Sequence, residues 1–491
     1  MSSDLAERAI FHRRVVEPNM YDNSGTRPLA VPGFGYPIDE ELESDERFGH
    51  GVDDFKQERL VAREIAMLGL MDAITDKPDW KRKVFDETIV ARWRTEALAM
   101  PLISERTWEW CLREVKEKAG FAKLHGFVRT LDSGSLCAKS DGLIKTALRD
   151  ELLVGVQPLL DVEDKLKDWH PNSGQKVLNL VHPSLFPLVY GRTQVLEHGH
   201  VGLLDCLDAC GRGEIPPEQI PEVKQERYGR WGIAQTEVRF SSRFQWLPAD
   251  VKFVGTTGTD VEITSYINNL FPAHHLGLYS TISKFIGKAI PMWNEVLVKG
   301  YNGRIPPRIK VWHAQIEPSS EPDDIIQEES DDDEINRIRF SQSAAKVLEY
   351  LNTPDNPDVV TESDEELDEK FAREAWIDEA HNVGDLHEAV NWKYKRVRRI
   401  LHPEPGDSIS FEEWKAGTTP RERIGGFGFT SRILNHEYQE IHLEQDFRAQ
   451  GLQVIVKLAS IELTPEKSEY AGGDWHLEGM MNERKVFHPH Q

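Results

Sequence analysis

Cysteine and long hydrophobic runs are both scarce in this sequence, and each scarcity excludes a class of protein. With 4 cysteines in 491 residues, the chain has too few for a disulfide scaffold, which favours a reducing compartment. It contains no run of about 18 apolar residues, so no membrane-spanning helix and no membrane partner are expected. The first residues lack the apolar centre of a signal peptide. We therefore predict a cytoplasmic or nuclear protein.

Positive charge is also in deficit, because 83 acidic residues outnumber 59 lysines and arginines and leave a formal net charge of -24. Proteins bind duplex nucleic acid through a positive face that contacts phosphates, so no nucleic-acid partner is expected. The sequence also lacks a phosphate-binding loop and a Gly-x-Ser-x-Gly nucleophile turn. Kinase and common hydrolase chemistry therefore have no motif to support them.

Changes of composition along the chain predict an α+β protein in four parts. Residues 1–54 are rich in turn-forming residues and indicate an extended arm. Residues 55–169 are expected to form a predominantly helical N-terminal domain, and residues 170–316 and 371–491 a β-rich C-terminal domain. Residues 317–370 are dominated by Asp, Glu, Ser and Pro, and we expect an acidic, largely disordered insertion there.

Helical spacing of apolar residues, including Leu60, Ile65, Leu68 and Met71, predicts a helix over residues 55–74. Further helices are expected over 83–98, 104–120, 141–153, 278–298 and 371–401, with a short helical run at 344–351. Ser104 is the expected N-cap of its helix, with Gly120 just past the end. The predicted strands are Val177–Val181, Gln235–Trp246, Asp250–Val254, Val261–Asn268, Arg308–Ile316 and Leu452–Ala459.

His476 and Glu478 form a candidate metal half-site. If this segment is extended, both side chains point to the same face, because strand side chains alternate. An imidazole and a carboxylate on one face supply two of the three ligands in the facial triad that holds non-haem Fe(II). The alternative is a surface strand with an ordinary histidine and glutamate, and spacing alone favours that alternative.

A second candidate metal site contains His198, His200, Cys206 and Cys210, which are all residue types that bind zinc. Cys206 and Cys210 would share one face of a helix. The favoured alternative is an amphipathic helix in which cysteine acts as a small hydrophobe, since the spacing departs from that of the usual zinc-binding pairs.

Two other groups of side chains have both a functional and a structural interpretation. His274 and His275 precede the helix predicted over 278–298, where they could bind an anion or line a pocket, or simply be tolerated. A basic cluster lies on the predicted helix 371–401, and we expect internal pairing with acidic runs rather than a nucleic-acid patch. The cluster consists of Lys393, Lys395, Arg396, Arg398 and Arg399.

Several long sequence words resemble those of a known family. They include Pro32–Pro37, Asp54–Leu60, Ala73–Trp80, Val181–Arg192 and Ser265–Leu270. On these words the chain resembles a fungal family catalogued as domain of unknown function 4246, in both its N-terminal and its C-terminal portions.

The C-terminal end of that family, represented here by Trp475–Gly479, is similar to Fe(II)/2-oxoglutarate dioxygenases. This resemblance implies that the β-rich domain is a partial double-stranded β-helix of jelly-roll type. It also implies that His476 and Glu478 are the first two Fe(II) ligands, with 2-oxoglutarate as co-substrate. The resemblance fades after Glu483 and the sequence stops at Gln491, so we expect a truncated metal site unless His488 or His490 supplies the third ligand.

Two functions are therefore considered. The leading hypothesis is an Fe(II)/2-oxoglutarate-dependent hydroxylase of a small-molecule or protein substrate, whose metal site is incomplete in this chain. The alternative is a non-catalytic scaffold in which acidic runs such as Asp331–Glu334 bind basic protein partners through charge.

Overall fold

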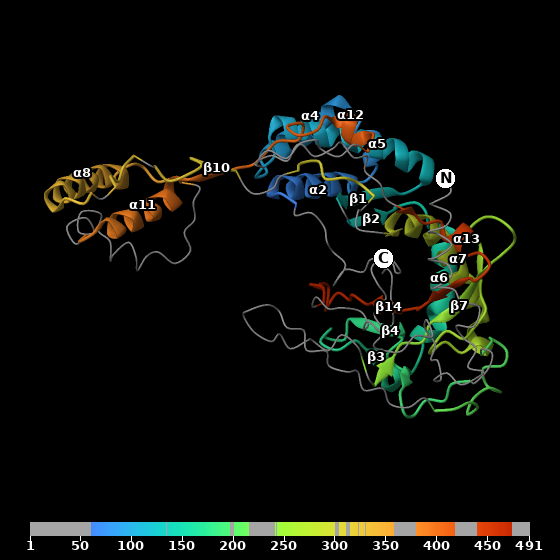
Figure 1. Cartoon of the computed structure of the whole chain (residues 1–491). Coiled ribbons are helices and arrows are strands. Elements are labelled where there is room, and N and C mark those ends of the chain that lie inside the picture. The colour runs from blue at the N-terminus through green and yellow to red at the C-terminus, as the bar shows by residue number, and fades with distance from the viewer. Residues whose placement is uncertain are drawn as a thin grey trace, which may run out of the picture.

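The computed structural model describes residues 60–133, 135–196, 201–215, 241, 243–299, 304–310, 315–322, 324–328, 330–357, 380–417 and 439–473. This part of the chain mixes helices and strands (Figure 1). Within it, none of the helices has both the length and the apolar character needed to cross a bilayer. The arm expected over 1–54 lies outside the described residues.

The helical domain groups four helices and a hairpin around one core (Figure 1). Its buried side chains include Met67, Trp93, Trp108 and Val115. The elements are α2 (Ala62–Thr75), α3 (Trp80–Lys83), α4 (Glu87–Leu98), α5 (Glu105–His125), β1 (Val128–Ser133) and β2 (Ser135–Lys139). The sequence predicts no strand in this region, so the antiparallel β1–β2 hairpin is an addition to the expected helical domain.

Helix α5 begins where the sequence predicts but ends later. The Ser104 hydroxyl accepts a hydrogen bond from the Thr107 N–H, which confirms Ser104 as the N-cap. The predicted end at Gly120 is wrong, because the helix continues to His125 and ends at Gly126, whose φ is +84°. A left-handed residue terminates a helix, whereas a glycine with helical angles does not. Ile65 of α2 is also not a core residue, since it is 57% exposed.

The β-rich domain contains two three-stranded antiparallel sheets with the orders β14-β4-β3 and β13-β7-β8. Leu178, Val251, Ile263 and Ile286 bring both sheets and α7 into one hydrophobic core. The elements are α6 (Thr146–Leu160), η1 (Asp164–Leu166), β3 (Asp168–Trp169), β4 (Val177–Val181), β5 (Leu188–Val189), β6 (Phe244–Gln245), β7 (Ala249–Phe253), β8 (Val261–Ile263), α7 (Pro272–Val296), β9 (Val298–Lys299), β12 (Gln439–Glu440), α13 (Leu443–Asp446), β13 (Leu452–Val454) and β14 (Leu458–Ile461).

The strand predicted over Val177–Val181 is confirmed as β4. The single strand predicted over Leu452–Ala459 is wrong, because the chain crosses from one sheet to the other within it. β13 pairs with β7, and β14 pairs with β4. The described strands do not close into a barrel, so the jelly-roll architecture stays a prediction.

The core of the helical domain also includes two segments from much later in the chain, which we call the strap: residues 304–310 and 402–417. Ile309 from the first segment and Ile409, Phe411 and Trp414 from the second are buried among the N-terminal helices. The second segment contains α12 (Phe411–Lys415). The helical core therefore takes in residues that the predicted boundaries place in the β-rich domain.

The described residues within 315–357 and 380–401, which lie between the two segments of the strap in the sequence, form what we call the insertion module. Its elements are β10 (Gln315–Glu317), α8 (Asp333–Leu351), α11 (Val383–Val397) and β11 (Arg399–Leu401). β10 pairs antiparallel with β11 at the base of the module. Figure 1 shows α8 and α11 side by side beyond β10, away from the other labelled helices.

Helix α8 is much longer than the short helical run expected within a largely disordered segment. Its Asp332 N-cap accepts hydrogen bonds from two backbone N–H groups, and acidic residues in its first turn suit the helix dipole. Ser343, Val347 and Leu351 lie four residues apart and are buried against α11. Acidic composition concealed this buried stripe, which is what makes the helix stable.

Candidate functional site

His476 and Glu478, the predicted metal ligands, lie outside the described residues, as do His488 and His490. The nearest described chain is the β13–β14 segment and the residues that follow it, as far as Gly473. Within the described part, no group of three or more His, Cys, Asp or Glu side chains is arranged to hold a metal ion. The iron site therefore stays a prediction.

Only half of the predicted zinc site lies within the described residues. His198 and His200 lie outside the described residues, whereas Cys206 is half-buried and Cys210 exposed in a turn over 203–210. His274 is exposed in the first turn of α7, and His275 beside it has non-helical backbone angles. Burial and the neighbouring His274 lower the pKa of His275, which favours its neutral form.

Three residues of the basic cluster, Lys393 and Arg396 on α11 and Arg399 on β11, pair internally, as the sequence predicts. Lys393 and Arg396 both contact the Asp355 carboxylate, and Arg399 contacts Glu317. Burial acts to raise the pKa of Asp355, but hydrogen bonds and charge from Lys393 and Arg396 outweigh it and lower the pKa. These cations therefore hold the insertion module together.

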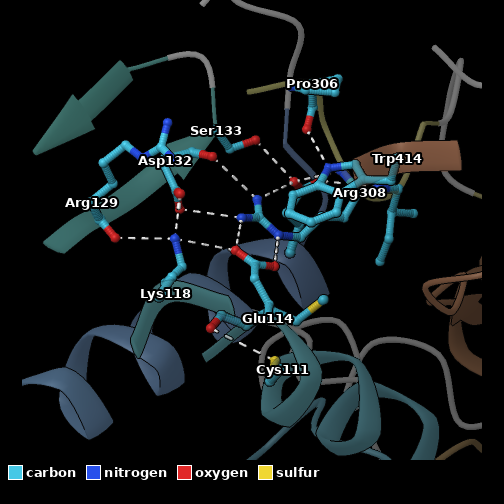
Figure 2. A network of polar contacts seen from close by, with 12 residues as sticks. Cys111, Glu114, Lys118, Arg129, Asp132, Ser133, Pro306, Arg308 and Trp414 are labelled. Carbon is cyan, nitrogen blue, oxygen red and sulfur yellow. Dashed lines mark hydrogen bonds and ion pairs between the residues drawn. The ribbon is translucent and has the colours of Figure 1, made fainter. Parts of the chain in front are cut away.

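The densest group of ionisable side chains in the described residues surrounds Arg308 (Figure 2). The Arg308 Nε–H donates to Glu114 Oε2 at 2.7 Å, and its Nη2 contacts both Glu114 and Asp132. Its backbone N–H donates to Glu64 Oε1 at 2.9 Å. Lys118 contacts Asp132 and lies 3.3 Å from Glu114 Oε1. We call these five residues the Arg308 network.

Several neighbours complete the hydrogen bonding of this network. The Ser133 hydroxyl donates to Glu64 Oε1 at 2.9 Å, and Arg308 Nη1 also donates to the Asp132 carbonyl at 3.3 Å. The indole N–H of Trp414 donates to the Pro306 carbonyl at 3.0 Å, while its ring lies against the Arg308 guanidinium at 4.9 Å. Figure 2 shows the Trp414 ring beside Arg308, with Glu114 below.

The electrostatics of the network follow from its burial. Burial raises the pKa of Glu64, and the charge of Arg308 offsets only part of that rise. For Asp132, burial also acts to raise the pKa, but Lys118 and Arg308 outweigh it and the pKa is lowered. Burial opposes ionisation of Arg308, yet Glu114, Asp132 and Glu64 together raise its pKa well above the ordinary value. The charged forms of Arg308 and Asp132 are therefore favoured.

The Arg308 network is a structural clamp rather than a site of chemistry. Arg308 and Glu64 are both 0% exposed, so neither a substrate nor solvent reaches them. Arg308 belongs to the strap, Glu64 to α2, Glu114 to α5 and Asp132 to β1. Charged hydrogen bonds thus fasten the strap to each layer of the helical domain.

The sequence does not identify this network, although it contains a partial signal. Glu114 and Lys118 lie in the apolar stripe of α5 that includes Cys111, Val115 and Ala119. Charged residues four apart in a buried stripe indicate a buried pair. Their partner Arg308 is nearly two hundred residues away, and nothing in the local pattern identifies it.

The fold and the sites define a mixed helix-and-strand protein with a clamped helical domain and a β-rich domain. A family model described as "Protein of unknown function (DUF4246)" matches residues 105–487, and "Domain of unknown function DUF4246, N-terminal" matches residues 31–96. The chain belongs to this family, because the first match alone covers more than half of the 491 residues. No curated protein and no solved structure matches the chain.

Proposed function

We propose that the chain is an Fe(II)/2-oxoglutarate-dependent hydroxylase of a small-molecule or protein substrate, with His476 and Glu478 as metal ligands. The observation that supports the proposal is the path of the chain before these residues. Leu452–Ile461 joins two antiparallel sheets that share one core, and the described chain continues from it to Gly473, three positions before His476 in the sequence. A sheet-supported strand is a rigid base for metal ligands.

Each residue would have a simple role in this site. The neutral imidazole of His476 and the carboxylate of Glu478 would hold the metal from one face and leave the other positions open. Bound Fe(II) together with 2-oxoglutarate would supply O2 activation for hydroxylation. The candidates for a third metal ligand are His488 and His490, the two histidines that follow Glu478 in the sequence.

Anaerobic titration with Mn(II) or Fe(II) tests the proposal directly. We expect one metal site in the wild type, and an affinity at least about tenfold lower in His476→Ala and Glu478→Ala, because even the loss of a residue that hydrogen-bonds a metal ligand costs that much. His387→Ala is the control, since His387 is exposed on α11. Single His488→Ala and His490→Ala variants test whether either histidine is the third metal ligand. Equal binding by the wild type and His476→Ala would rule out this site.

A second candidate function, a scaffold for basic protein partners, is favoured by the charge distribution on the insertion module. The module has its own hydrophobic core, and its Lys393, Arg396 and Arg399 are paired internally. The acidic run Asp331–Glu334 is exposed at the start of α8. Exposed carboxylates at this point would attract a basic surface.

Neutralising these carboxylates tests the scaffold function. We expect Asp331→Asn/Asp333→Asn/Glu334→Gln to lose a basic partner that the wild type retains, while Asp332 is kept as the N-cap of α8. High salt should weaken the wild-type interaction in the same way, because it screens exposed charges. A control variant neutralises three exposed acids elsewhere, Asp150, Glu163 and Asp164. Binding that is insensitive to salt and survives the triple change would contradict this function.

A further inference from the structure

Cys206 and Cys210 lie within a single turn on the surface of the β-rich domain. The Ala209 N–H donates to the Asp205 carbonyl at 2.9 Å, and the Cys210 N–H donates to the Leu207 carbonyl at 3.1 Å. These two bonds wind residues 205–210 into roughly one helical turn. Side chains four residues apart in a helical turn lie on the same face, so we expect the two thiols to lie on one side of this turn.

The two thiols are also accessible, unlike that of Cys111 in the core of the helical domain. Cys210 is exposed and Cys206 is half-buried, whereas Cys111 is fully buried in the helical domain. Burial raises the pKa of the Cys111 thiol and keeps it protonated and unreactive. Cys137 is exposed too, but it lies on β2 of the helical domain.

The local backbone allows these sulfurs to join. A disulfide needs Cβ atoms about 3.5–4.5 Å apart, and positions i and i+4 of a helix place them at about 5–6 Å. The turn must therefore tighten by about 1–2 Å. It is a short turn rather than part of a long helix, and Gly211 and Gly213 follow it with φ angles of +77° and +101°. These glycines let the chain adjust without strain in the flanking residues.

The surrounding contacts confine that adjustment to the turn. Bridges between Gly202 and Ser265 and between Val195 and Glu214 fix the segment on both sides of the cysteines. A zinc site is the other use of paired thiols, but it needs four ligands, and the described residues offer no third.

We propose that Cys206 and Cys210 are a reversible oxidation site that closes to an intrachain disulfide. The exposed Cys210 thiolate attacks glutathione disulfide, forms a mixed disulfide and releases one glutathione thiolate. The Cys206 thiolate then attacks the Cys210 sulfur, forms the Cys206–Cys210 bond and releases the second glutathione. The protein loses two protons and two electrons, and one glutathione disulfide is reduced to two glutathione molecules.

Intact mass spectrometry and peptide mapping of the full chain test this proposal. After incubation with glutathione disulfide, we expect the mass to fall by two hydrogens and one peptide to contain the Cys206–Cys210 bond. Thiol counting should show the loss of two reactive groups, and dithiothreitol should restore both. Cys137→Ser should behave like the wild type in this respect. Cys206→Ser and Cys210→Ser should each stop at a stable glutathione adduct.

Three outcomes would overturn the proposal. Separate glutathione adducts on Cys206 and Cys210 in the wild type would show that the two sulfurs cannot meet. Unchanged thiols after oxidation would show that they do not react. Co-purified zinc whose removal by a chelator is needed before either cysteine reacts would assign the pair to a metal site instead.

Discussion

Replacing Arg308 with methionine is expected to lower the free energy of unfolding by about 3–5 kcal/mol, the cost typical of removing one partner from a buried ion pair. Arg308 is fully buried, and its guanidinium contacts Glu64, Glu114 and Asp132. Methionine fills much of the same volume but leaves three carboxylates with Lys118 as their sole nearby cation among the network residues. Desolvated carboxylates without a partner destabilise the folded state far more than the lost packing does.

Urea or guanidinium unfolding followed by tryptophan fluorescence measures this change, because Trp414 and several other tryptophans are buried in the core of the helical domain. Arg82→Met is the matched control. The Arg82 side chain is 72% exposed and pairs only with Asp79 on the surface, so its loss should cost less than about 1 kcal/mol. A loss below about 1 kcal/mol in Arg308→Met would contradict the clamp, because it would mean that the carboxylates are neutral or hydrated in the folded protein.

Glu114 and Glu64 bind different parts of Arg308. Glu114 accepts two hydrogen bonds from the guanidinium, whereas Glu64 binds mainly the backbone N–H groups of Arg308 and Ile309. Glu114 therefore holds the side chain of Arg308, and Glu64 holds the strap backbone. The two roles explain why the strap needs both residues to stay in register against α2 and α5.

The features that the sequence predicts correctly are those set by neighbours in the chain. Ser104 caps α5 through a residue three positions away, and the aliphatic run Val177–Val181 forms β4 with the predicted bounds. In each case the chain carries the physical cause within a short window.

The features that the sequence does not predict depend on distant residues or on a local signal that the structure does not follow. Gly120 has the composition of a helix end but helical angles, since α5 continues to Gly126. The strap joins the helical domain through contacts that span more than two hundred residues, including the bond between Arg308 and Glu64. Domain boundaries drawn from composition cannot show that late segments of the chain pack into the core of the N-terminal domain. The His476 and Glu478 half-site lies outside the described residues and stays a prediction.

The second large effect is expected in the insertion module, where Lys393→Met should open α8 and α11 without affecting the helical domain. Lys393 is 0% exposed, and its ammonium group contacts the Thr353 carbonyl and the Asp355 carboxylate. Loss of these charged hydrogen bonds should cost about 1.5–3 kcal/mol, at the lower end if water reaches the partly exposed Asp355.

Hydrogen exchange measured by peptide resolves where that energy is lost. Amides of α8 and α11 should exchange about tenfold or more faster in Lys393→Met, since each 1.4 kcal/mol is a factor of ten. Amides of α5 should be unchanged, because the module has its own core and joins the helical domain through the β10–β11 pair. Lys395→Met is the control, as Lys395 is exposed two residues along the same helix. Faster exchange in α5 as well would mean that the module and the helical domain unfold as one unit, so the module could not act as an independent binding element.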